Sequence, residues 1–324
     1  MSFEGTNGIR RVMRRKHGRE AGVASVVALM LLLAVIVTFL SLYATTYLPA
    51  LKQQAEIEQV TSVKEAFMRF DNDIDHVISD GTAATYGETV PLGGGDILLD
   101  PEKSSGLLSV GDPQALSTIQ LTWSNGTAAG SYASSLVNVS YVPSYTFWEA
   151  QGYTWQYGYI NVTKGGRSTP LSYNTMGDVN ARRIPGYAGK LLEITPVWDT
   201  TTPSVLDRLV ITAVTMEPSG VPGDKNFVSG NGACVLRINA TVTTQSLSTT
   251  SQEGLTVSVT PGDTSTPFYP YLDSYIQQQM GAIGQTNSSL ASPLGNQYTL
   301  TIPQSPDQPV TVIVNQIHVS VYVQ

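Results

Sequence analysis

The sequence has few of the side chains on which most enzyme chemistry depends. Its 324 residues include one cysteine, Cys234, and three histidines, of which only His76 and His318 follow the N-terminal region. It contains no G-x-S-x-G pattern and no glycine-rich loop that ends in lysine and a hydroxyl residue. These absences exclude an internal disulfide, a zinc site built from histidine and cysteine, and the sequence patterns of serine hydrolases and phosphate-binding loops. We therefore predict no cofactor and no metal site.

Charged residues are scarce and unevenly placed. They make up 13% of the chain, with 25 acidic and 18 basic residues. The basic residues at the N-terminus are Arg10, Arg11, Arg14, Arg15, Lys16 and Arg19. The rest of the chain is therefore more acidic than the net charge of −7 indicates, which argues against nucleic acid as a partner. With so few charges, solubility depends on Ser, Thr, Asn, Gln and Gly, and this composition favours strands and loops.

No charge at all occurs between Ala21 and Leu51, and the run from Val23 to Ala44 is almost wholly apolar. This length predicts a transmembrane helix, which we place at residues 19–48. Because the basic residues precede it, we expect residues 1–18 to stay in the cytoplasm and the C-terminal domain to lie outside the cell. The lipid bilayer is thus the first predicted partner, and we predict a single-pass protein of the cell membrane.

An amphipathic stalk helix is predicted at residues 49–81. Its apolar residues recur at spacings of three and four: Ile57, Val60, Val63, Phe67, Phe70, Ile74 and Val77. Gly81 supplies a C-terminal cap, and Pro49 is expected to kink the helix rather than end it. The stripe fits two uses, packing on the protein's own domain or packing on neighbouring copies. We interpret Asp71, Asp73 and Asp75 as part of a solvated face rather than as a calcium loop, since no glycine follows at the required position.

Residues 82–324 are expected to form an extracytoplasmic, mainly β domain, either an antiparallel sandwich or a layered meander. With the long N-terminal helix, the predicted fold class of the whole chain is α+β. Strands are expected at 84–90, 106–110, 118–123, 136–142, 153–162, 190–197, 207–216, 233–242, 254–260, 297–302 and 310–323. One short helix is expected near residues 267–284, and Gly284 would end it. We prefer one continuous β unit, with a weak subdomain boundary at residues 217–232 as the alternative.

Two surface features carry hypotheses about binding and modification. Aromatic residues crowd residues 145–159, where a contact patch would consist of Trp148, Tyr153, Trp155 and Tyr157. The alternative, which we favour, is aromatic packing between neighbouring strands inside the domain. N-glycosylation sequons occur at Asn125, Asn138, Asn161, Asn239 and Asn287, all beyond the membrane segment.

The segment RRKHG, which ends at Gly18, and the following REAGVASVVALMLLLAVIV resemble the class III leader of archaeal type IV pilins and pilin-like proteins. The resemblance covers about residues 10–80. It implies a cut between Gly18 and Arg19, retention of the apolar helix, and assembly with copies of the chain or with other pilin-like subunits. Two departures are Arg19 as the first mature residue and the lack of glutamate at the fifth position after Gly18. Residues 90–110 and the aromatic segment also resemble archaeal exported proteins of unknown function, which implies no catalytic residues.

Three functional hypotheses follow. The first is a pilin-like, membrane-anchored archaeal surface protein with a structural or filament-forming role. The second is an uncleaved single-pass protein whose β domain binds envelope polymer or a partner protein. The third is a membrane-tethered hydrolase, which would need two carboxylates that lie close together in a cleft. The sequence does not indicate which two of the following would do so: Glu88, Asp96, Glu149, Glu193, Asp199 and Glu217. We predict that the chain is not an enzyme.

Overall fold

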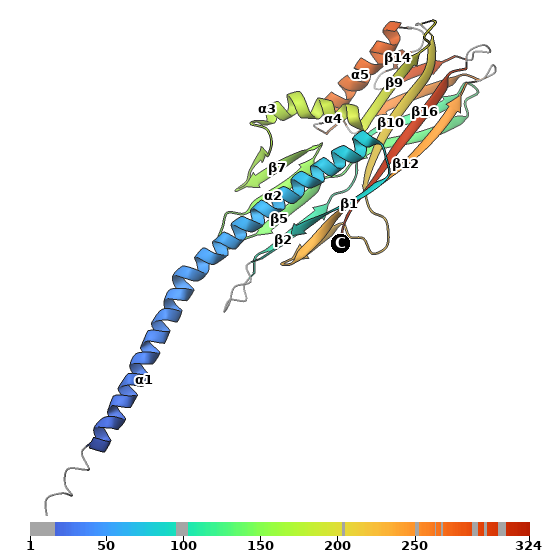
Figure 1. Cartoon of the computed structure of the whole chain (residues 1–324). Coiled ribbons are helices and arrows are strands. Elements are labelled where there is room, and N and C mark those ends of the chain that lie inside the picture. The colour runs from blue at the N-terminus through green and yellow to red at the C-terminus, as the bar shows by residue number, and fades with distance from the viewer. Residues whose placement is uncertain are drawn as a thin grey trace, which may run out of the picture.

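A computed structural model describes residues 17–94, 103–202, 205–249, 253–262, 264–266, 268–286, 291–294, 297–303 and 309–324. One long N-terminal helix leads into a β-rich domain (Figure 1), which confirms the predicted fold class, a mainly β domain with a long N-terminal helix and α+β overall. Of the predicted cytoplasmic leader, residues 1–18, the first 16 lie outside the described residues.

The helical elements are α1 (His17–Leu42), a π-helical turn (Tyr43–Tyr47), α2 (Leu48–Asp80), α3 (Met176–Asp178), a second π-helical turn (Val179–Arg183), α4 (Ile184–Leu191) and α5 (Tyr269–Thr286). The strands are β1 (Ala84–Pro91), β2 (Ser105–Val110), β3 (Gln114–Trp123), β4 (Ala128–Leu136), β5 (Val139–Ser144), β6 (Gln151–Gln156), β7 (Tyr159–Lys164), β8 (Arg167–Pro170), β9 (Leu192–Trp198), β10 (Leu206–Pro218), β11 (Phe227–Gly230), β12 (Ala233–Ser248), β13 (Leu255–Pro261), β14 (Ala291–Leu294), β15 (Gln297–Ile302) and β16 (Thr311–Val323).

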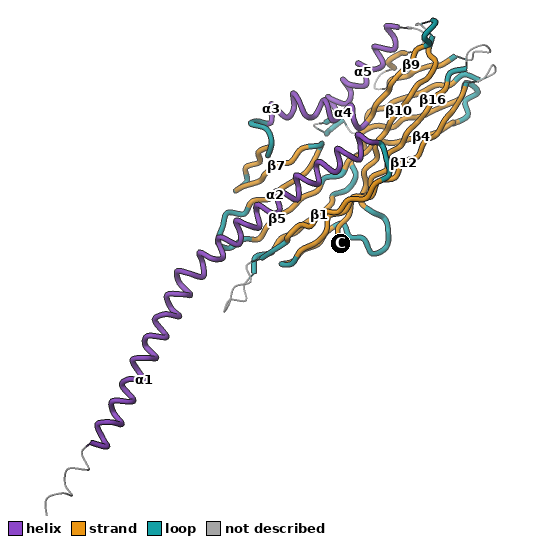
Figure 2. The backbone as a smooth tube through the Cα atoms, viewed as in Figure 1, coloured by secondary structure: helices purple, strands orange, loops and turns teal. Residues whose placement is uncertain are grey.

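The first half of the long helix extends away from the domain, whereas α2 lies along it (Figure 2). The large apolar side chains of α1 between Val23 and Leu42 are exposed, with exposed fractions from 46% to 71%. The helix is long and apolar enough to cross a membrane. Exposed apolar surface of this extent requires a nonaqueous neighbour.

The junction between the two halves is a π-helical turn at Tyr43–Tyr47. The backbone N–H of Leu48 donates to the carbonyl of Tyr43, five residues earlier. Pro49 follows directly, and a proline has no N–H to donate and its ring clashes with the carbonyl four residues earlier, here that of Thr45. The wider turn accommodates this proline, and the helix changes direction there without ending (Figure 1).

Two sheets form the domain. Six strands pair antiparallel in the order β11-β2-β5-β6-β7-β8, and ten strands form a second sheet in the order β1-β12-β16-β10-β4-β3-β13-β15-β14, with β9 paired to β10. β10 and β16 run parallel from Arg208 to Pro218, which departs from the antiparallel pairing expected from the sequence. The two strands are distant in the chain, so no tight hairpin forces them to be antiparallel.

β16 changes the face that it buries half way along its length. Its buried residues are Val312 and Val314 in the first half, and Ile317, Val319, Val321 and Val323 in the second half. These sets lie on opposite faces, because side chains alternate along a strand and the pairing with β12 shows no register shift. β16 therefore buries apolar side chains on both of its faces, and it also contacts β2 and β11 of the six-stranded sheet.

The segment at residues 217–232 does not divide the chain into separate sheets. It contains β11, which pairs with β2 of the six-stranded sheet, and the chain then returns to the ten-stranded sheet at β12. The buried apolar side chains of the described residues form one cluster. A single β unit with interleaved sheets accounts for this arrangement better than two consecutive subdomains.

Four local predictions were wrong. The strand expected at 136–142 spans the break between β4 and β5, and the helix expected to end at Gly284 continues to Thr286. Residues 153–162 form a hairpin instead of one strand, because Tyr157 and Gly158 adopt left-handed backbone angles, with φ of 47° and 74°. A second helical segment, Met176 to Leu191, precedes β9 where the sequence predicted a strand from residue 190. Thr175 caps this segment through its side chain, which accepts a hydrogen bond from the N–H of Asp178.

Replacing Gly158 by alanine is expected to lower the free energy of unfolding by about 2–4 kcal/mol. A Cβ there would lie 2.4 Å from the ring of Tyr187, which is buried, and the positive φ adds strain. Gly166 is the matched control, since its φ is 79° but nothing lies within 4 Å of its Cβ position. Urea unfolding of the detergent-solubilised protein measures both, and an equal loss for the two variants would contradict the role of Tyr187.

Candidate functional site

The stalk helix packs its apolar stripe on the protein's own domain. Val63, Phe67, Phe70 and Ile74 are fully buried. The ring of Phe67 lies 5.8 Å from that of Tyr153, and the ring of Phe70 meets Trp155 edge-on at 5.5 Å. Of the two uses predicted for the stripe, packing on the domain is therefore confirmed over this part of the helix.

The aromatic segment lies mainly inside the domain. Tyr153 and Trp155 are fully buried, and Tyr157 is 7% exposed and stacks on Phe268 at 5.2 Å. These three residues were predicted as members of an exposed contact patch, and their burial makes that prediction wrong. The alternative is right in placing them inside the domain, but their ring contacts are with α2, α4 and Phe268 instead of with a neighbouring strand. Tyr153 and Trp155 lie on the face of β6 that packs on α2, which the sequence pattern alone did not reveal. Trp148, 40% exposed, is the only one of the four that reaches the surface.

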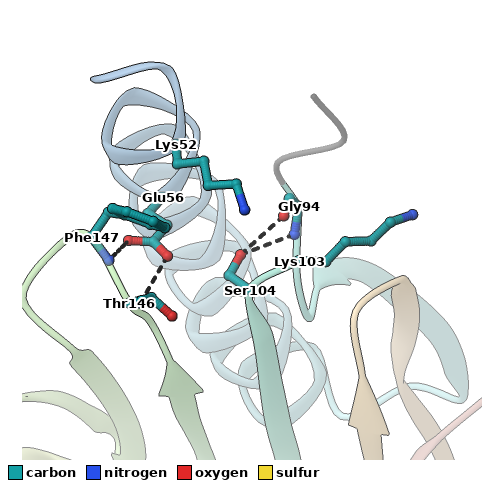
Figure 3. Close-up of a pocket in the computed structure, with 7 residues that line it drawn as sticks. All are labelled: Lys52, Glu56, Gly94, Lys103, Ser104, Thr146 and Phe147. Atoms are coloured by element: carbon teal, nitrogen blue, oxygen red, sulfur yellow. Dashed lines mark hydrogen bonds between the residues drawn. The ribbon is translucent and has the colours of Figure 1, made fainter. Parts of the chain in front are cut away.

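A polar cluster joins α2 to two loops at the end of the domain from which α1 departs (Figures 1 and 3). We call it the base clamp, and its members are Lys52, Glu56, Gln59, Ser104, Thr146 and Phe147. The carboxylate of Glu56 accepts hydrogen bonds from the backbone N–H groups of Thr146 at 3.0 Å and Phe147 at 2.9 Å. The ammonium of Lys52 lies 5.4 Å from the centre of the Phe147 ring. These contacts fix loop 145–150 beside the helix.

Gln59 ties the clamp to the six-stranded sheet. Its amide nitrogen donates to the Tyr141 hydroxyl at 2.9 Å, and its amide oxygen accepts from Ser104 at 3.0 Å. Lys52, Glu56 and Gln59 are only 3% to 5% exposed, and polar groups so buried are stable only with partners. The adjoining cavity holds about 20 Å³, room for about one water molecule, so the cluster is a structural joint and not a ligand pocket.

A second, charged joint lies farther along α2. Arg183 donates to Asp75 at 3.0 Å and lies 3.5 Å from Asp71, while Lys190 is 3.5 Å from Asp75. Asp71 also accepts a hydrogen bond from the Trp155 indole at 2.7 Å. The interpretation of this acidic run as a solvated face was wrong for Asp71 and Asp75, because both cations come from the helical segment that the sequence did not predict.

Three of the six carboxylates considered for catalysis have separate local partners. Glu88 pairs with Arg69 at 2.5 Å and Glu217 with His318 at 3.2 Å. Asp199 accepts from two backbone N–H groups of its own turn, and these hydrogen bonds lower the pKa of its carboxyl. Asp96 lies outside the described residues. No group of three His, Cys, Asp or Glu side chains that could hold a metal ion occurs among the described residues.

The predicted modification sites are placed as follows. Gly18 and Arg19 belong to the first turns of α1. Asn125, Asn138 and Asn239 are exposed, whereas Asn161 is 7% exposed within β7, and Asn287 lies outside the described residues. Glycosylation stays a prediction for the exposed sequons, and we expect the burial of Asn161 to block a glycosyltransferase from reaching it in the folded domain.

Comparisons of the chain with protein-family models, curated proteins and solved structures find no match.

Proposed function

We propose that the protein is a pilin-like, membrane-anchored surface protein of an archaeon with a structural or filament-forming role. One observation supports this most: along a single unbroken helix, an apolar half with exposed side chains changes into a half whose stripe is buried on a β domain. The exposed half suits a lipid bilayer, and the buried half holds the domain at a fixed position relative to it.

The proposed orientation follows from the charges at the two ends of the apolar run. Basic residues precede it, and positively charged flanks stay in the cytoplasm. The β domain and its exposed sequons then lie outside the cell. Glu88, Glu217 and Asp199 each bind a local partner of their own. This agrees with a structural or binding role in place of catalysis.

The pilin-like part of the proposal depends on the leader. Cleavage after Gly18 would leave α1 at the new N-terminus, free to leave the bilayer and pack with the α1 helices of other subunits. Without cleavage, the basic leader would hold each chain in the membrane as a separate surface protein. Arg19 directly after the cut is the feature that favours this second candidate.

Intact mass of the membrane-extracted protein tests the proposal, after expression in an archaeal host with and without its prepilin peptidase. We expect residues 1–18 to be lost only when the peptidase is present. Gly18→Val should abolish the loss, and the control Gly8→Val, within the leader, should not. A full-length chain in both hosts would reject the filament-forming role and leave the anchored surface protein, whereas recovery in the soluble fraction would reject anchoring as well.

A further inference from the structure

We propose that the end of the β domain nearest to α1 binds the lipid headgroup layer of the membrane that holds α1. The surface consists of Tyr47, Lys103, Phe147 and Trp148, and we call it the base surface. This inference rests on the proposed anchoring of α1, and it adds a second contact with the membrane, made by the folded domain.

The helix sets the height of this surface above the membrane. Lys52 is the first charged residue after the uncharged stretch, and Glu56, one turn later, holds the backbone of Thr146 and Phe147. At 1.5 Å per residue, Lys52 and Glu56 lie about 12 and 18 Å beyond Ala44, where the apolar run ends. The headgroup region extends about 5–8 Å beyond the hydrocarbon on each side. Loop 145–150 is thus held about 10–13 Å above the outer edge of the headgroups of an untilted helix, and the usual helix tilt of about 20° brings one side of the domain closer.

The side chains at this level have the chemistry of a membrane interface. Trp148 is 40% exposed and Tyr47 is 59% exposed, and Trp and Tyr concentrate where the apolar core of a bilayer meets water. Lys52 and Lys103 line the same small opening as Phe147 (Figure 3). Lys103 is exposed, and its long side chain can extend the ammonium group to a lipid phosphate while the stem stays against the protein. Lys52 is 4% exposed and supports the Phe147 ring from below.

The base clamp gives the loop a rigid support for this contact. Glu56 is 3% exposed, and its carboxylate holds two consecutive backbone N–H groups immediately before Trp148. Trp148 therefore follows a segment that is fixed to the membrane helix itself. A loop attached only to the far sheet would not keep a constant distance from the bilayer.

Fluorescence quenching tests the proposal on the full-length protein in liposomes whose lipids carry a nitroxide on the headgroup. We expect the nitroxide to quench the wild-type protein, and Trp148→Phe to lose most of that quenching. Trp198→Phe is the matched control, since Trp198 ends β9 at the opposite end of the domain, and it should keep the quenching (Figure 1). Circular dichroism verifies that both variants fold.

Flotation of the same liposomes separates this inference from the proposed function. Protein that floats while Trp148 is not quenched would overturn the headgroup contact and leave the anchor intact. Protein that does not float would overturn both. Trp148 emission that depends on protein concentration but not on the nitroxide would also overturn the proposal, because a second copy of the chain would then cover the base surface.

Discussion

Replacing Phe70 by alanine is expected to lower the free energy of unfolding of the domain by about 3–5 kcal/mol. Phe70 is fully buried between α2 and the six-stranded sheet, and its ring meets Trp155 edge-on at 5.5 Å. The substitution removes this contact and leaves a cavity that the surrounding helix and strands fill only partly. Urea unfolding of the detergent-solubilised protein, followed by tryptophan fluorescence, measures the loss.

The control for this prediction lies on the same helix. Met68 is 42% exposed, so Met68→Ala is expected to change the free energy of unfolding by no more than about 0.5 kcal/mol. A loss of less than about 1 kcal/mol for Phe70→Ala would mean that α2 contributes little to the stability of the domain. The stalk helix would then be a detachable element instead of part of the core.

Replacing Arg183 by methionine is expected to cost about 3 kcal/mol at neutral pH, because it leaves two carboxylates of α2 with one partly exposed lysine. Asp71 and Asp75 are 23% and 27% exposed, and the guanidinium of Arg183 lies between them. Methionine keeps most of the side-chain volume, so the loss reports on the charge and on the hydrogen bond that Arg183 donates to the Gly158 carbonyl, and not on a cavity. Arg182→Met is the control, since Arg182 is the exposed neighbour on the same turn.

The cost of Arg183→Met should also depend on pH. Burial raises the pKa of Asp71, while the hydrogen bond from Trp155 and the charge of Arg183 lower it. Loss of Arg183 therefore raises this pKa further. A carboxyl whose pKa is higher in the folded than in the unfolded state favours folding as the pH falls. The deficit should shrink from pH 7 towards pH 4, and a deficit that is equal at both values would contradict the electrostatic explanation.

The sequence predicted the elements whose periodicity is long and regular. The uncharged run and the three-and-four spacing from Val60 to Val77 fixed the long helix, and alternation predicted β13 and most of β16. These patterns are local, since each residue's environment is set by its own helix or strand. The polar joints were not predictable in this way. From the sequence alone, Glu56 and Asp75 are indistinguishable from surface residues of the helix. Their partners come from segments that are distant in the chain.

The misses have a common physical origin. The hairpin at residues 156–159 depends on left-handed backbone angles at Tyr157 and Gly158. Tyrosine rarely adopts such angles, so its presence did not indicate a turn. The helical segment before β9 is short, contains Pro185 and Gly186, and is held by its packing under α5 and against α2. In both regions, tertiary contacts determined a secondary structure that differs from the one that the local sequence favours.

The π-helical turn at Tyr43–Tyr47 fixes how the exposed apolar half of the helix is rotated about its axis relative to the domain. Each residue of an α-helix advances about 100° around the axis, so one additional residue in a turn rotates everything before it by that angle. Each face of α1 therefore points in a fixed direction relative to the sides of the β domain. Whatever lies against a given side of α1, lipid or another helix, therefore also takes a fixed position relative to the sides of the β domain.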